Sequence, residues 1–361
     1  MKFVINSSEL SKAIERVIKI VPSRPVMQIL ANIKLVALED TVLLTAFDTA
    51  SGIQLEVQSE VLESGEICVP AQAFSAIAKG MAGQLIIEVI GDTMTLTDLS
   101  GSCEIQCQQV DEYPHFIDKG IDKTIQCEID IKTFVQAIKL GGSCAATDES
   151  KHILQGVNIV AQDGLLTMAS TDGHRLIVYK TKVDESVKIP SSVIPAKVLS
   201  TIEGNGKMTL TIDEDTCLVN TSDTTLTCRL FAGKYPDYPK LLPKEFMRTA
   251  TVERVQLIDA LNLMSVISNG DSLVKFSFES SQLLIKCEKE GLKGERTIDC
   301  ELDGEDLTLA LNLKYLLGQL KIIPGERVLF SMNEALAPLT IRPASSELDL
   351  LCLLMPVQLR G

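Results

Sequence analysis

A helical stretch recurs at a nearly fixed interval, and this repeat limits what the chain can fold into. Amphipathic stretches cover residues 8–20, 130–140 and 252–266, with Leu10, Phe134 and Leu257 at equivalent positions. A second helical stretch follows in each interval, at residues 71–80, 196–203 and 310–321. Because each period of such a repeat is one structural unit, we expect three units, with bounds 1–121, 122–246 and 247–361.

The segments between these helices are strand-like. Runs rich in β-formers lie at residues 41–47, 84–90, 208–212 and 273–278, and Gly91-Asp92 and Asp163-Gly164 are typical turns. Ser8 suits the N-cap of the first helix, and prolines 70 and 195 suit the first turns of two others. Each unit is therefore predicted to hold antiparallel strands and two helices, which is an α+β fold.

The charge of the chain is strongly acidic. Its net charge is −14, and its hydrophobic content of 45% excludes a disordered chain. An acidic balance argues against a protein that coats nucleic acid with its whole surface. The six helical stretches nevertheless carry ten Lys or Arg residues against six acids. A surface lined by all six could face phosphates while the remainder repels them.

Signals for export, membrane insertion and metal binding are missing from the sequence. The N-terminus lacks the apolar stretch of a signal peptide, and no run of 18 apolar residues occurs. Ten cysteines without such a signal are typical of reduced thiols, so we expect a cytoplasmic protein. There is no CxxC pair, no phosphate-binding loop and only three histidines, so we expect neither a metal nor a cofactor.

Two segments stand out as candidate sites. Asp172-Gly173-His174-Arg175 is compatible with a catalytic histidine, with a plain hydrogen-bonded turn, or with the rim of a protein-binding surface. The nearly wholly apolar C-terminal residues 350–359 are unusual for a chain end. We expect them to form a final strand and then one wall of a surface groove.

Several motifs together resemble the bacterial DNA polymerase III β subunit family, the β sliding clamps. They are Met1-Lys2-Phe3, Ser23-Arg24-Pro25, residues 29–32, Thr171 to Leu176, Tyr235-Pro236-Asp237-Tyr238 and Met355-Pro356-Val357. The resemblance runs through the whole chain in order. It implies a head-to-tail homodimer whose six units form a ring around duplex DNA, with helices lining the hole. Such a ring tethers the replicative polymerase and performs no chemistry.

The resemblance also implies a pocket for short peptides of the replicative polymerase, of the ATP-dependent clamp loader and of other proteins that carry a clamp-binding motif. The matching positions are Leu154, Thr171, Gly173, His174, Arg175, Leu176, Pro236, Lys240, Leu241, Met355, Pro356, Val357, Gln358 and Leu359. Lys240 and Gln358 stand where the family often has arginine, and Arg360 and Gly361 extend past the usual last leucine.

By the same resemblance, the DNA-facing residues are Arg24, Lys151, His152 and Lys197. A dimer interface is expected at Cys103, Ile105, Cys107, Val266 and Ile267. Two other hypotheses stay open at this point. One is an enzyme that uses His174 and Asp172, and the other is a monomeric scaffold that binds peptides without encircling DNA.

Overall fold

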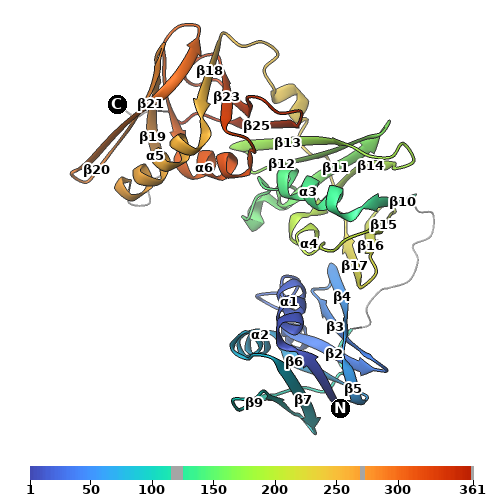
Figure 1. Cartoon of the computed structure of the whole chain (residues 1–361). Helices are drawn as coiled ribbons and strands as arrows, with labels where there is room; N and C mark the ends of the chain where they lie inside the picture. Colours follow the sequence, from blue (N-terminus) through green and yellow to red (C-terminus); the bar gives the residue numbers. More distant parts are fainter. Residues whose placement is uncertain (115–124, 269–272, 359–361) are drawn as a thin grey trace. The chain divides into compact units, whose positions relative to one another are not determined.

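The computed structural model describes residues 1–114, 125–268 and 273–358 (Figure 1). The chain divides into two compact units. The first contains residues 1–134, 186–189 and 194–231, and the second contains residues 135–185, 190–193 and 232–361. Each unit is described by itself below.

The first unit contains a five-stranded antiparallel sheet of order β5-β1-β7-β8-β9. Its strands are β1 (Lys2–Asn6), β5 (Glu60–Glu63), β7 (Gln84–Ile90), β8 (Thr93–Thr97) and β9 (Ser102–Gln106). Burial alternates along β1 and β8, because successive side chains of a strand point to opposite faces. β5 and β9 are the two edges of this sheet.

An eight-stranded sheet of order β10-β15-β16-β17-β4-β3-β2-β6 completes the first unit. Its strands are β2 (Asn32–Leu38), β3 (Thr41–Phe47), β4 (Ser51–Gln58), β6 (Gly65–Pro70), β10 (Ile125–Asp130), β15 (Lys207–Ile212), β16 (Thr216–Asn220) and β17 (Thr224–Arg229). The pairing of β4 with β17 joins the first sequence repeat to the second, with Ile53 opposite Leu226.

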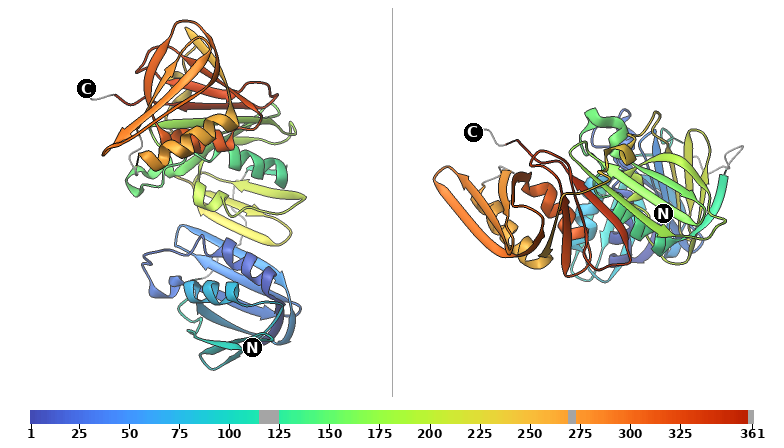
Figure 2. Two further views of the ribbon diagram at one scale, coloured as in Figure 1. Left: turned by 60° about the vertical axis from the view of Figure 1, so that its left-hand side comes forward. Right: turned by 90° about the horizontal axis from the view of Figure 1, so that it is seen from above.

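Helices α1 (Ser7–Val17) and α2 (Ala71–Gly80) lie side by side in the first unit (Figure 2). Leu10 and Ile14 of α1 are fully buried, as their spacing predicts. The predicted N-cap was wrong: Asn6 caps α1, and its side chain accepts the backbone N–H of Ser8. The helix begins one residue earlier than expected because Asn6, the last residue of β1, supplies this acceptor.

The short helix α4 (Ala196–Leu199) is tied to α1 inside the first unit by two lysines. Lys19 donates to the carbonyl of Ser200 at 2.8 Å, and Lys197 donates to the carbonyl of Ile20 at 3.2 Å. Each ammonium thus satisfies a carbonyl just beyond the C-terminal end of the other helix. The buried Arg16 adds hydrogen bonds to the Thr201 carbonyl and the Thr224 hydroxyl.

The second unit is built on a twelve-stranded sheet of order β14-β11-β12-β13-β25-β24-β23-β18-β21-β20-β19-β22. Its strands are β11 (Gly156–Gln162), β12 (Leu165–Thr171), β13 (Arg175–Lys182), β14 (Ile189–Pro195), β18 (Arg248–Glu253), β19 (Leu273–Phe278), β20 (Gln282–Lys289), β21 (Leu292–Asp303), β22 (Leu307–Asn312), β23 (Arg327–Met332), β24 (Leu339–Pro343) and β25 (Asp349–Leu354). The expected C-terminal strand is confirmed as β25, which pairs with β13.

Helices α5 (Arg254–Ile267) and α6 (Leu313–Ile322) lie side by side in this unit (Figure 2). Both start later than the sequence predicts, because β18 and β22 continue to the residues that cap them. Glu253 and Asn312 accept two backbone N–H groups each from the first turns of α5 and α6. Helix α3 (Ile131–Gly141) and the 3₁₀ turns η1 (Gln28–Ala31), η2 (Glu149–Gln155) and η3 (Tyr238–Leu241) complete the elements.

The two compact units do not follow the three sequence repeats, for a reason visible in the sheets. The second repeat contributes β15 to β17 to the sheet of the first unit and β11 to β13 to the sheet of the second. It therefore shares one sheet with each neighbour. Across residues 1–114, 125–268 and 273–358, no helix is both long enough and apolar enough to span a membrane.

Candidate functional site

The loop between β12 and β13 is organised by one carboxylate. Asp172 is buried, and its Oδ1 accepts the backbone N–H groups of His174 and Arg175 at 3.0 and 3.1 Å. Its Oδ2 accepts Arg175 Nε at 2.9 Å. The Thr171 hydroxyl closes the loop by donating to the Arg175 carbonyl at 2.7 Å. Because ionised acceptors form the stronger hydrogen bonds, this loop presents its side chains in a fixed arrangement.

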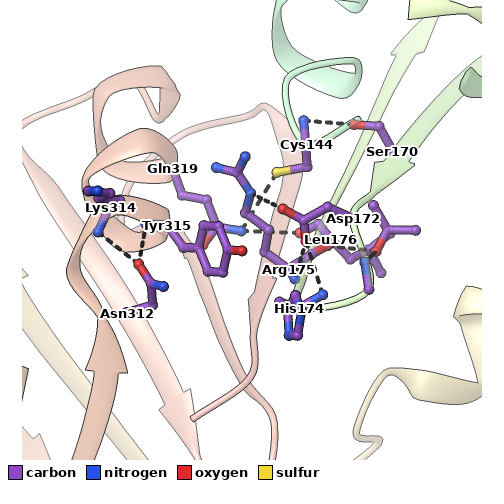
Figure 3. A network of polar contacts seen from close by, with 12 residues as sticks. Cys144, Ser170, Asp172, His174, Arg175, Leu176, Asn312, Lys314, Tyr315 and Gln319 are labelled. Atoms are coloured by element: carbon purple, nitrogen blue, oxygen red, sulfur yellow. Dashed lines mark hydrogen bonds and ion pairs between the residues drawn. The ribbon is translucent and has the colours of Figure 1, made fainter. Parts of the chain in front are cut away.

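Helix α6 supplies the surface on which these side chains rest (Figure 3). The Arg175 guanidinium lies over the Tyr315 ring, 4.8 Å from its centroid, and His174 stacks on the same ring at 6.0 Å. A Cβ on Gly318 would lie 3.1 Å from Arg175 Nη1, so glycine gives the guanidinium room against the helix. Arg175 is thus held by Asp172 on one side and by an aromatic face on the other.

Gln319 connects the same helix to the strands beneath. Its side chain is fully buried, and Nε2 donates to the Leu353 carbonyl at 3.0 Å and to the Leu176 carbonyl at 3.4 Å. Leu176 and Leu353 are opposite each other where β13 pairs with β25. The Gln319 amide therefore connects α6 to both β13 and β25, the two strands whose pairing joins the second repeat to the third.

The residues after β25 run past this loop as an apolar segment. The Met355 backbone N–H donates to the His174 carbonyl at 3.0 Å, and Val357 N–H donates to the Ala310 carbonyl at 2.8 Å. Met355 and Val357 are 37% and 39% exposed, and Leu241 is 56% exposed. Tyr238 and Leu242, on either side of Leu241 in the sequence, pack on Ala169, Leu176, Val178, Leu351 and Leu353. We group the exposed or half-exposed residues His174, Arg175, Leu241, Met355 and Val357 under the name Met355 groove, after the pocket that the resemblance implies for them.

This geometry does not support catalysis by His174. The carboxylate of Asp172 accepts the main-chain N–H of His174, and the imidazole stacks on the Tyr315 ring. Among the described residues, no hydrogen bond between a carboxylate and this imidazole is found. A catalytic histidine would need a group that orients its ring and a nucleophile beside it. Within the part of the chain that the structure describes, no cluster of three or more His, Cys, Asp or Glu residues is arranged to hold a metal.

The other residues that the resemblance implies for the pocket differ in burial and in the elements that carry them. Thr171 and Leu176 are buried, whereas Gly173 is exposed with a φ of 91°, which glycine adopts without strain. Lys240 is exposed and forms an ion pair with Asp237 at 2.7 Å, which raises its pKa. Leu154 lies in η2, Pro236 precedes η3, and Pro356 and Gln358 follow β25. Leu359 lies outside the described residues.

Sequence reasoning missed Tyr315, Gln319 and the anchoring role of Asp172. Tyr315 and Gln319 belong to a helix about 140 residues away in sequence from the His174 loop. An amphipathic pattern predicts that helix but not which loop it contacts. Tyr235 was quoted only as part of a motif, yet its buried hydroxyl accepts Thr171 N–H at 3.2 Å, and burial raises its pKa.

The four residues expected to face DNA have different surroundings. Arg24 is exposed, and the structure gives it no polar partner among the described residues. Lys197 is exposed but shared between the Ile20 carbonyl and Asp48, at 3.2 Å each. Lys151 donates to the Asp172 carbonyl at 2.7 Å, so its ammonium lies beside the His174 loop. His152 is exposed in η2.

The residues expected at a dimer interface fall into two sets. In and just after β9, Cys103 is exposed, whereas Ile105 and Cys107 are buried in their own unit. A partner strand could therefore pair with the main chain at Ile105 and Cys107 but not with their side chains. On α5, Val266 is 73% exposed. Ile267 Cδ1 lies over Gly294 of β21, so closely that a Cβ at that position would collide with it.

Three family models together match nearly the whole chain. They describe the N-terminal, central and C-terminal domains of the DNA polymerase III beta subunit, over residues 1–117, 128–237 and 239–358. The chain is 32% identical to the beta sliding clamp of Synechocystis, and the alignment covers 99% of this chain and 100% of that protein. It is 28% identical to the beta sliding clamp of Bacillus subtilis, and that alignment covers 99% of this chain and 100% of that protein.

Solved structures have the same fold. The DNA polymerase III beta subunit of Thermotoga maritima superposes with a TM-score of 0.88 at 22% identity, covering 99% of this chain and all of that one. The DNA polymerase sliding clamp of Bacillus subtilis superposes with a TM-score of 0.82 at 26% identity and covers both chains completely.

Proposed function

The chain belongs to the DNA polymerase III beta subunit family, the beta sliding clamps, and on this premise we propose which of its residues bind partners and close a ring. It is a processivity factor of DNA polymerase III and catalyses no reaction. We assign three clamp domains to residues 1–121, 122–246 and 247–361. Its proposed partners are duplex DNA, the replicative polymerase, an ATP-dependent clamp loader and other proteins with clamp-binding motifs.

The observation that carries the partner assignment is the Met355 groove. It combines exposed apolar side chains with one guanidinium held in place by Asp172 and Tyr315. A peptide gains affinity from burying leucine- or phenylalanine-like side chains there, and Arg175 fixes its orientation. Met355 is unbranched and adapts to different side chains, which suits a site shared by several partners.

Paired substitutions test the groove. Met355→Asp with Val357→Asp should weaken binding of peptides from the replicative polymerase at least tenfold, because charges replace its apolar wall. Leu336→Asp is the matched control, since Leu336 is 57% exposed in the same unit and lies outside the groove. Fluorescence anisotropy with labelled peptides gives both affinities. Equal affinities for the two variants would overturn the assignment.

The sheets support closure by a second copy of the chain. Where the first repeat meets the second, β4 pairs with β17, and where the second meets the third, β13 pairs with β25. At each of these junctions, a strand of one β-hairpin pairs with a strand of a hairpin from the neighbouring repeat. Two corresponding hairpins, β8–β9 of the first repeat and β20–β21 of the third, take no part in these junctions. β9 is a sheet edge, and residues 292–299 of β21 pair with β20 alone in the described chain. We assign β9 of one copy and β21 of the other to the dimer seam. Two identical seams would close a ring of six domains.

A ring holds DNA by topology, so strong phosphate contacts are unnecessary. In the first unit, Arg16, Lys19, Lys79 and Lys197 all form ion pairs with acidic residues. Their charges are therefore largely neutralised. We propose that Arg24, Lys151, His152 and Lys197 make weak, sequence-independent contacts with the backbone, which permits sliding.

Native mass across a dilution series tests the seam. The wild-type protein should remain near twice 39.3 kDa, and Ile267→Asp should shift it toward the monomer, because each seam would bury an unpaired charge. Val255→Asp, at the exposed start of the same helix, should leave the dimer intact. A monomeric wild-type protein at every concentration would refute the ring and leave a peptide-binding scaffold.

A further inference from the structure

A hollow lies beside the segment that leads to Leu241, and the proposal above assigns no ligand to it. It has a volume of about 610 Å³, within the range of ligand-binding pockets. Its lining consists of Asn158 on β11, Ser191 and Val193 on β14, and residues 233–239. We call it the Lys234 hollow. All of its lining residues belong to the second unit.

The segment from Pro236 to Leu241 separates the hollow from the groove. Pro236 and Tyr238 line the hollow, while Tyr238 also packs on the cluster of Leu176 and Leu353 beneath the groove. Leu241, three residues further on, is part of the groove itself. The segment that carries Leu241 is therefore continuous along the chain with one wall of the hollow.

The polar groups of the hollow are suited to a carboxylate with neighbouring main chain. Lys234 is exposed and has no ion-pair or hydrogen-bond partner in the described chain, whereas the nearby Asp237 is already paired with Lys240. Asn158 is only 6% exposed; its Nδ2 donates to the Ser191 hydroxyl at 3.0 Å, and the described residues donate no hydrogen bond to its Oδ1. The hollow thus offers one unpaired cation, one hydroxyl proton and one amide acceptor.

We propose that the Lys234 hollow binds an acidic stretch of a partner protein, directly flanking the segment that occupies the Met355 groove. This inference rests on the proposed function. The arguments for this occupant are continuity with the groove and the charge of Lys234. Asn158 Oδ1 accepts a main-chain N–H of the flank, and the apolar surfaces of Val193 and Tyr238 cover its carbon atoms.

The test uses synthetic peptides tiled through the replicative polymerase of the same genome. The core peptide is the shortest one that binds the wild-type dimer but does not bind the Met355→Asp, Val357→Asp variant. It is then lengthened by four residues containing two glutamates, at the N-terminus in one version and at the C-terminus in the other. Matched versions carry glutamine in place of glutamate.

One glutamate version should bind wild type about three- to tenfold more tightly than the core peptide, an advantage of up to about 1.4 kcal/mol. The advantage should shrink with added salt and with glutamine. Lys234→Glu and Ser191→Trp should abolish it and leave core-peptide affinity unchanged, because neither residue lines the groove. Gln162→Trp, an exposed position at the end of β11, is the control and should preserve it.

The outcomes separate the two proposals. If no tiled peptide depends on the Met355 groove, the proposed function of the groove fails, and this inference fails with it. If the core peptide binds but neither extension improves affinity, the hollow alone is wrongly assigned. An advantage that survives both Lys234→Glu and Ser191→Trp would place the flank elsewhere and also overturn the inference.

Discussion

Asp172 shows how much of this site depends on single buried contacts. The sequence drew attention to His174, whose position in a conspicuous motif is compatible with catalysis. The structure instead gives the organising role to the neighbouring carboxylate, which receives three hydrogen bonds from His174 and Arg175. Without it, Arg175 would lose its fixed position over Tyr315.

Replacing Asp172 with alanine should therefore weaken both the groove and the fold. Hydrogen bonds to an ionised group contribute about 1.5–3 kcal/mol each, and we expect a net loss of about 3 kcal/mol in the free energy of unfolding. Peptide affinity should fall at least tenfold. Urea denaturation and anisotropy measure the two effects. Asp349→Ala removes an exposed carboxylate, and a similar loss there would show that the effect is not specific to Asp172.

At the scale of elements, the helix starts depend on polar side chains at strand ends. Asn6, Glu253 and Asn312 each end a strand and cap the helix that follows. A strand therefore passes directly into a helix without a loop. This is why the starts of these three helices differ by one to three residues from those that hydrophobic periodicity predicts.

The caps of α1 can be distinguished by mutation. Asn6→Ala should lower the free energy of unfolding by about 1 kcal/mol, since the Ser8 N–H loses its acceptor. Ser8→Ala should change it much less, because Ser8 contributes only its main chain to the cap. Thermal unfolding of both variants checks this. A larger effect at Ser8 would mean that the sequence-based cap was correct after all.

Two helix-terminal glycines should respond oppositely to alanine. A Cβ on Gly141 of α3 would lie 2.6 Å from Met168 Cβ and 2.9 Å from its carbonyl oxygen, so Gly141→Ala should destabilise the protein by about 1–3 kcal/mol. Gly80 of α2 has no atom within 4 Å of the same position, and Gly80→Ala should be neutral or stabilise by up to about 1 kcal/mol. Chemical denaturation of the pair measures the difference, and equal effects would contradict the close packing of α3.

At the scale of the whole molecule, buried thiols give the fold a pH limit. Burial raises the pKa of Cys68 from 9.0 to about 12, and those of Cys107, Cys144 and Cys300 to about 11. The folded state therefore keeps protons that the unfolded state releases above about pH 9. Stability is fully present below that pH and is lost progressively as the pH rises toward 11–12.

We expect the free energy of unfolding to fall steeply between pH 9 and pH 10.5, by on the order of 1 kcal/mol for each of these thiols. Rapid guanidinium titrations at pH 7.5, 9 and 10.5 measure it. Cys144→Ala should make the profile shallower, whereas Cys103→Ser, at an exposed position, should leave it unchanged. A flat profile for the wild-type protein would show that these thiols ionise equally in both states.

The sequence alone was enough to predict the α+β class, because hydrophobic periodicity and the recurrence of residues 8–20, 130–140 and 252–266 are local or regular signals. Strands β3, β7 and β19 have the predicted bounds, and each of the six helical stretches contains a helix. The resemblance also drew attention to the His174 loop and the C-terminal segment, for which the pocket stays a prediction.

Only the tertiary structure decided which distant segments meet. Tyr315 and Gln319 reach the His174 loop because α6 packs there, and the second repeat divides its strands between two sheets because β4 pairs with β17 and β13 with β25. The Lys234 hollow likewise depends on residues 233–239 lying beside Asn158 of β11 and Ser191 and Val193 of β14. Periodicity reports which face of an element is buried, but not which partner buries it, since apolar surfaces attract one another without direction.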